Sequence, residues 1–251
     1  MEEHNKKIRE VKIMFERKKY KNFAKKQLSG RWGIPVLVTL VIAVISIVFS
    51  IPDVLHLSRS GYFYALLSGD YYSAMDALNA ANSTSFVTTI VDMIVSAIIE
   101  VAAIGLYLKM SRSPEPVSFS DFIDGFNNWA RAALGILWQT LWTTLWTLLF
   151  IIPGIIKSIA YSQMFYILVE YKEISVTKAM RVSIEITKGH KWDLFVMYLS
   201  FIGWGILAAF TLGILNFWLV PYMNMTYVNA YHALMKEALE SGRIKPEDLT
   251  E

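Results

Sequence analysis

Long apolar runs separated by short polar segments dominate the sequence. A helix needs about 20 mainly apolar residues to cross roughly 30 Å of hydrocarbon, because lipid cannot satisfy an unpaired backbone group. Six runs approach that length, so the pattern predicts an all-α, polytopic membrane helix bundle. We expect its six transmembrane spans at about 33–51, 86–108, 132–152, 155–171, 193–209 and 213–233.

Three residues are expected to break these helices. Pro153 and Gly154 close the third run, so the fourth helix is expected to start directly after them. Pro221 lies inside the sixth run, where its missing N–H frees the carbonyl of Phe217 and favours a kink. The turn before that run, at 211–213, is expected to be very short.

The composition agrees with a membrane protein. Hydrophobic residues make up 55% of the chain and charged residues 18%, against roughly 25% charged residues in soluble domains. With no cysteine in the chain, disulfides, thiolate metal sites and cysteine nucleophiles are excluded. The four histidines have no metal-ligand spacing, and neither a nucleophile elbow nor a phosphate-binding glycine loop occurs. We therefore expect no enzyme activity, no cofactor and no metal.

The basic residues indicate how the chain is oriented. All of the Lys and Arg residues except Arg59 and Lys157 fall in the terminal segments and in the second-to-third and fourth-to-fifth connections. Positive charge is retained on the cytoplasmic side, so both termini are expected there, with a multi-pass chain in a bacterial inner membrane. This distribution favours a lipid surface as the partner of the basic residues and does not indicate nucleic acid.

Three regions follow from the pattern: a basic N-terminal segment (1–31), a membrane domain (32–235) and a charged tail (236–251). Within the first, apolar positions recur among many cations between Lys6 and Leu28. This segment either lies as an amphipathic helix on anionic headgroups or is a solvated tail that sets the topology. Short interfacial helices are expected after Ser118 or Ser120 and after Ser175, with lipid-facing packing favoured over a regulatory docking surface.

Ionisable side chains inside the spans are the best indication of a polar site, because an unpaired charge in lipid costs at least about 2.5 kcal/mol. Asp92, Ser96 and Glu100 recur every four residues along the second run, which places its two carboxylates about 12 Å apart. That separation excludes a proton shared between them. Lys157 is expected at the depth of Asp92, and we predict a pair that serves as a packing clip or as a substrate anchor. Glu100 has no evident partner and is the stronger functional candidate.

Polar residues in the sixth run extend this candidate site. Asn224 and Tyr227 share a helix face, which either lines a wet cavity or forms hydrogen bonds that hold neighbouring helices together. Trp138, Trp142 and Trp146 form a stripe in the third run, which we interpret as a packing or lipid-facing seam. The complete candidate site comprises Asp92, Ser96, Glu100, Lys157, Asn224 and Tyr227.

Five short motifs resemble a known family in their order and spacing. They are LSGRWG at 28–33, FSDFIDGF at 119–126, IIPGIIK at 151–157, KGHKW at 188–192 and WLVPYM at 218–223. The chain thereby resembles the bacterial integral-membrane family catalogued as domain of unknown function number 975. The resemblance implies a polytopic, all-helical protein of the bacterial cytoplasmic membrane. It implies no activity and no site residues.

Two functions are compatible with these features. The first is a non-enzymatic structural or accessory component of the membrane with a buried polar core. The alternative is a transporter or channel that binds an ion or small solute at the intramembrane polar site. The two differ in hydration, because a transporter must admit water to its polar core in at least one state.

Overall fold

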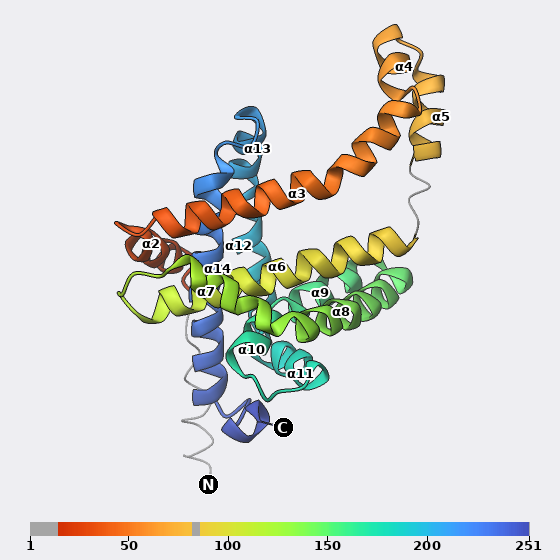
Figure 1. The fold of residues 1–251 in the computed structure, drawn as a ribbon. Coiled ribbons are helices and arrows are strands. Elements are labelled where there is room, and N and C mark those ends of the chain that lie inside the picture. The colour runs from red at the N-terminus through yellow and green to blue at the C-terminus, as the bar shows by residue number, and fades with distance from the viewer. Residues whose placement is uncertain (1–14, 82–85, 251) are drawn as a thin grey trace.

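The computed structural model describes residues 15–81 and 86–250, which form helices and turns and contain no strand (Figure 1). Residues 1–14 of the predicted basic segment lie outside the described part of the chain. The helices are α2 (Arg17–Leu28), α3 (Gly33–Arg59), α4 (Tyr62–Ser68), α5 (Tyr71–Ala81), α6 (Phe86–Arg112), α7 (Phe119–Gly125), η1 (Phe126–Asn128), α8 (Trp129–Leu149), α9 (Ile151–Tyr161), α10 (Met164–Glu170), α11 (Val176–Ile186), α12 (Lys191–Leu199), α13 (Ile202–Phe210), α14 (Asn216–Glu240) and η2 (Pro246–Leu249).

Four stretches within the described residues are long and apolar enough to cross a membrane. They are Gly33–Arg59, Thr88–Arg112, Ile151–Glu170 and Lys191–Phe210. They match four of the six expected spans. The other two expected spans form the helices α8 and α14, which are less apolar because threonines and a glutamine interrupt α8 and asparagines and tyrosines interrupt α14. The six-span arrangement therefore stays a prediction.

The expected break at Pro153 and Gly154 lies elsewhere. Helix α8 ends before Phe150, whose extended backbone (φ −158°, ψ 140°) reverses the chain. Pro153 lies in the first turn of α9, where a missing N–H breaks no helical hydrogen bond. Gly154 is helical as well. A Cβ atom there would lie 2.9 Å from the Cα of Thr147, so this glycine allows α9 to pack closely against α8.

Two further interruptions were not predicted. The fourth expected span consists of α9 and α10, which are separated at Ser162 and Gln163. The fifth consists of α12 and α13, separated at Ser200 and Phe201. Helix α14, in contrast, continues through Pro221. Serine and glutamine give no strong helix-breaking signal, which explains why the apolar runs looked continuous.

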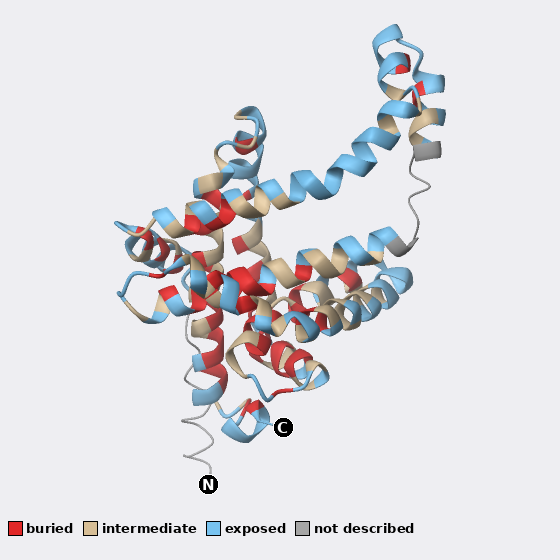
Figure 2. Cartoon of the chain, in the orientation of Figure 1, coloured by how far each residue is buried: buried red, intermediate tan, exposed pale blue. Residues whose placement is uncertain are grey.

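The core lies where the C-terminal half of α6 meets α10 and α14 (Figure 2). Its largest buried side chains include Tyr107 from α6, Met164 from α10 and Tyr231 from α14. Helix α3 contributes little to this core. Only Pro35, Val38 and Thr39 of its 27 residues are buried, so the rest of this apolar helix is exposed or only partly buried.

The amphipathic helices pack on protein. Helix α2 lies against α14 through Tyr20, Ala24 and Leu28. Its other lysines are exposed, whereas Lys21 is half-buried and donates to Ser200. Helix α7 begins with the capping box of Ser118 and Asp121, one of the two caps that we expected. Helix α11 begins at Ser175, as predicted. We expected the apolar faces of α7 and α11 to pack against lipid, and this prediction is wrong. Phe122 in α7 and the apolar face of α11 are buried in the protein core.

Candidate functional site

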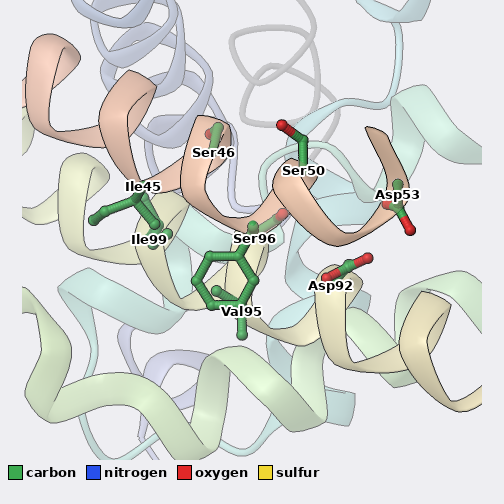
Figure 3. A pocket seen from close by; sticks show the side chains of 9 residues that line it. Ile45, Ser46, Ser50, Asp53, Asp92, Val95, Ser96 and Ile99 are labelled. Carbon is green, nitrogen blue, oxygen red and sulfur yellow. The ribbon is translucent and has the colours of Figure 1, made fainter. Parts of the chain in front are cut away.

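A polar groove of about 210 Å³ lies between α3 and α6 (Figure 3). Helix α6 contributes Asp92 and Ser96, two of the residues expected to form a polar face. Helix α3 contributes Asp53 and two serines, Ser46 and Ser50. The rest of the lining is apolar and consists of Ile45, Phe49, Val95 and Ile99.

Both carboxylates of the groove are exposed, and neither forms a hydrogen bond or an ion pair within the described residues. The hydroxyls of Ser46 and Ser50 donate to carbonyls of their own helix, at 2.9 and 2.8 Å. Their oxygens can still accept a hydrogen bond. The groove therefore offers acceptors to a cation or to water, and it has no cation of its own.

The predicted pair between Asp92 and Lys157 is not formed. The ammonium group of Lys157 lies 4.5 Å above the ring centre of Trp146, a cation–π contact between α9 and α8. Asp92 faces α3 instead. A similar depth in the membrane does not bring two side chains together, because it does not fix the rotation of each helix about its axis. That rotation decides which neighbour a side chain meets.

Glu100 is not part of the groove lining. Four residues turn an α-helix by about 400°, so a stripe at this spacing drifts around the helix and leaves the α3 side by its third member. Glu100 is within electrostatic range of the phenol groups of Tyr166 and Tyr198. It forms no ion pair among the described side chains.

Asn224 and Tyr227 are separated from the groove. Asn224 faces the hydroxyl of Tyr107. The ring of Tyr227 packs edge-on against Tyr198 and Phe201, with ring centres 5.2 and 5.7 Å apart. The structure thus divides the predicted site into four parts: the groove with Asp92 and Ser96, the aromatic cluster of Tyr227 and Tyr198 near Glu100, Asn224 beside Tyr107, and Lys157 against Trp146.

Sequence reasoning missed Asp53. The first span was expected to end at about Ile51, but α3 continues through Pro52 to Arg59. The apolar residues Val54 and Leu55 beyond Pro52 were the available signal. They show that the run does not end at the proline.

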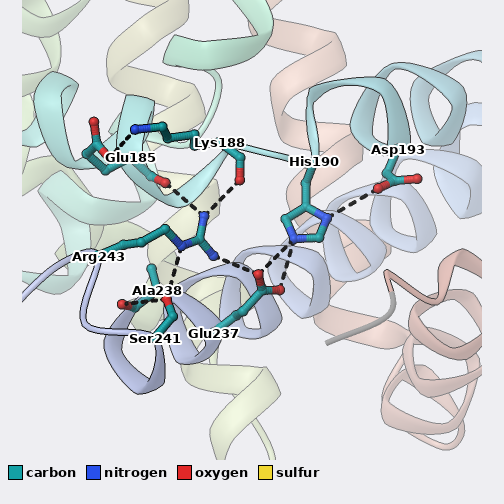
Figure 4. Close-up of polar contacts among 8 residues, drawn as sticks. All are labelled: Glu185, Lys188, His190, Asp193, Glu237, Ala238, Ser241 and Arg243. Atoms are coloured by element: carbon teal, nitrogen blue, oxygen red, sulfur yellow. Dashed lines mark hydrogen bonds and ion pairs between the residues drawn. The ribbon is translucent and has the colours of Figure 1, made fainter. Parts of the chain in front are cut away.

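A second polar centre surrounds His190 at the junction of α12 and α14 (Figure 4). The imidazole is only 2% exposed, and its Nε2 lies 2.9 and 3.0 Å from the two carboxylate oxygens of Glu237. Its Nδ1 lies 3.2 Å from Asp193. The guanidinium of Arg243 donates to Glu237 at 2.7 Å. His190 is thus a buried, hydrogen-bonded histidine at the start of α12.

Several basic side chains bind backbone carbonyls at helix ends. Arg131 donates to the carbonyls of Leu168 and Tyr171, at 2.6 and 2.9 Å, and to that of Ile174. Arg243 donates to the carbonyl of Lys188 at 2.8 Å. The last carbonyls of a helix have no partner within it and carry its negative dipole end. These cations therefore serve as helix caps.

Taken together, four stretches long and apolar enough to cross a membrane, a helical core and a polar groove between α3 and α6 give an all-helical fold of the kind that membrane proteins have, and its described residues include no metal cluster. Comparison with known protein families identifies the family of the chain. The profile of DUF975, a protein family of unknown function, matches residues 14–160 and 136–238, so the chain belongs to this family. No curated protein and no solved structure matches the chain significantly.

Proposed function

We propose that this protein is a non-enzymatic structural or accessory component of the bacterial cytoplasmic membrane. In this proposal the chain crosses the membrane six times with both termini in the cytoplasm. The exposed lysines of α2, Lys18, Lys19, Lys25 and Lys26, face anionic headgroups. Docking of the opposite face of α2 on α14 supports this orientation, because it holds the basic face outward.

The closed inner end of the groove carries the proposal. Below the groove, α6 enters an apolar core in which Val101, Ala102 and Leu106 are at most 1% exposed. A solute that entered between α3 and α6 would meet this core before it reached the cytoplasmic side. In a scaffold such a core can stay dry, whereas a transporter must open it.

One observation favours the alternative, a transporter or channel for a cation or a small polar solute. Asp53 and Asp92 are two unneutralised carboxylates in helices that are apolar enough to cross a membrane. Each would cost about 2.5 kcal/mol or more in lipid unless water or a ligand reaches it. The missing pair with Lys157 strengthens this alternative, because a packing clip no longer explains Asp92.

Thiol labelling separates the two functions, because the chain has no cysteine of its own. Single cysteines are introduced by Ser50→Cys and Ser96→Cys in the groove. Val44→Cys is the control, an exposed apolar position on the same α3 helix. Each variant is treated with a membrane-impermeant maleimide in intact cells and in inverted vesicles.

We expect the groove cysteines to be labelled in intact cells only, or in neither preparation. Val44→Cys is expected to stay unlabelled in both. Labelling of Ser96→Cys from both sides would contradict the accessory function, because it requires the inner core to open. That result would favour transport. Labelling of Val44→Cys at the rate of the groove cysteines would show that water reaches the outer face of α3, which contradicts a transmembrane α3.

A further inference from the structure

A second groove, of about 460 Å³, lies between the start of α8 and the turn that joins α10 to α11. One wall is apolar and consists mainly of Leu134 and Trp138. The opposite rim carries Lys172 and Glu173, followed by the first residues of α11. The groove therefore combines an apolar wall with charges of both signs.

The two rim charges are available to a ligand. Lys172 and Glu173 are exposed, and within the described residues neither side chain forms a hydrogen bond or an ion pair. The neighbouring cations are already engaged. Arg131 caps α10, and Lys178 donates to the carbonyls of Glu247 and Thr250 near the C-terminus.

The beginning of α11 adds positive potential to the Lys172 side of the groove. Ser175 caps this 11-residue helix by accepting from the N–H of Lys178. The N–H groups of Val176 and Thr177 precede the first intrahelical donor, so they remain free to bind an anion. An anionic group is therefore favoured beside Lys172, and a cationic group beside Glu173.

The apolar wall continues along α8 away from the rim. Leu134, Leu137 and Leu141 follow one another at helical spacing and are 61%, 38% and 50% exposed. This stripe can accommodate an acyl chain, while the rim binds a polar head. The matching ligand is thus an amphiphile whose head carries a phosphate and an amine.

We propose that this groove binds one zwitterionic phospholipid with a phosphoethanolamine headgroup. Its phosphate lies against Lys172 and the first N–H groups of α11, and its ammonium group lies against Glu173. Its acyl chain follows Leu134 and Leu137. This site is separate from the groove between α3 and α6 and does not depend on the function proposed above.

The test uses the full-length protein, purified in a neutral detergent and studied by native mass spectrometry with added lipid. Phosphatidylethanolamine and phosphatidylglycerol are compared, since only the first carries an amine. The variants are Lys172→Gln, Glu173→Gln and Leu134→Gln. Lys188→Gln is the control, an exposed lysine outside the groove.

We expect Lys172→Gln to weaken the binding of both lipids about fivefold, as is typical for one lysine at a lipid surface. Glu173→Gln is expected to weaken phosphatidylethanolamine binding and to abolish its preference over phosphatidylglycerol. Leu134→Gln is expected to weaken both. Lys188→Gln is expected to leave the binding unchanged.

Equal binding of the two lipids by the unaltered protein would overturn the proposed headgroup. An effect of Lys188→Gln as large as that of Lys172→Gln would show general charge attraction and overturn the site itself. Free phosphoethanolamine provides the last comparison. If it competes at the concentration at which the lipid binds, the acyl contact with α8 is wrong.

Discussion

At the scale of single residues, one guanidinium fixes the loop between α10 and α11 by hydrogen bonds to its carbonyls. Arg131, at the start of α8, binds the three carbonyls at the end of α10 and in the turn that follows. A planar guanidinium has five donors in a fixed geometry, whereas an ammonium group offers a point charge. Lysine at this position would therefore leave part of the carbonyl set without a partner.

We expect Arg131→Lys to lower the free energy of unfolding by about 2 kcal/mol, the usual cost of losing charged hydrogen bonds to buried partners. The midpoint of thermal denaturation of the purified protein measures this change. Arg181→Lys is the matched control, because Arg181 is exposed on α11 and forms no hydrogen bond among the described residues. Equal midpoints for the two variants would show that the carbonyl contacts contribute little.

At the scale of helices, glycines decide how closely two elements approach, and the sequence did not reveal which ones. In the structure, a Cβ at Gly203 or Gly205 would meet open space. A Cβ at Gly125 in α7 would lie 2.4 Å from the Cα of Ala102 in α6, which is impossible without moving a backbone.

Gly125→Ala is therefore expected to destabilise the fold by about 3 kcal/mol, because the clash is with backbone atoms that cannot rotate away. Gly205→Ala is expected to be neutral or to stabilise by up to about 1 kcal/mol through its higher helix propensity. Thermal denaturation of both variants tests this difference. A Gly125→Ala protein as stable as the unaltered one would contradict the tight contact between α6 and α7.

At the scale of the whole molecule, the number of spans decides on which side each loop lies. With six spans, the connection between α10 and α12 is cytoplasmic and the turn at Leu212 is outside. With only the four most apolar stretches as spans, both positions change sides. Lys172, Lys178, Arg181, Lys188 and Lys191 in that connection favour six spans.

Single cysteines at the exposed positions Lys188 and Leu212 test this topology. We expect Leu212→Cys to react with an impermeant maleimide in intact cells and Lys188→Cys to react only in inverted vesicles. The reverse pattern would establish four spans and place α8 and α14 outside the set of crossing helices. Ser73→Cys, in the exposed helix α5, is expected to label from outside in either case and serves as the positive control.

The sequence by itself determined the helical class, the apolar runs and the cap at Ser175, and it left Ser118 and Ser120 as alternatives for the other cap. It also placed a turn at 211–213, which the structure extends to Leu215. These features depend on residues that are close along the chain. An apolar run, a capping side chain or a glycine at positive φ acts within a few positions, so its signal survives without knowledge of the fold.

Only the tertiary structure decided which polar groups meet. Asp92 faces Asp53 of α3 instead of Lys157, and His190 lies against Glu237, 47 residues further along the chain. Such contacts depend on the rotation and crossing angle of packed helices, which the fit of many side chains sets together. The candidate site was therefore predictable as a set of polar residues, but its division into separate contacts was not.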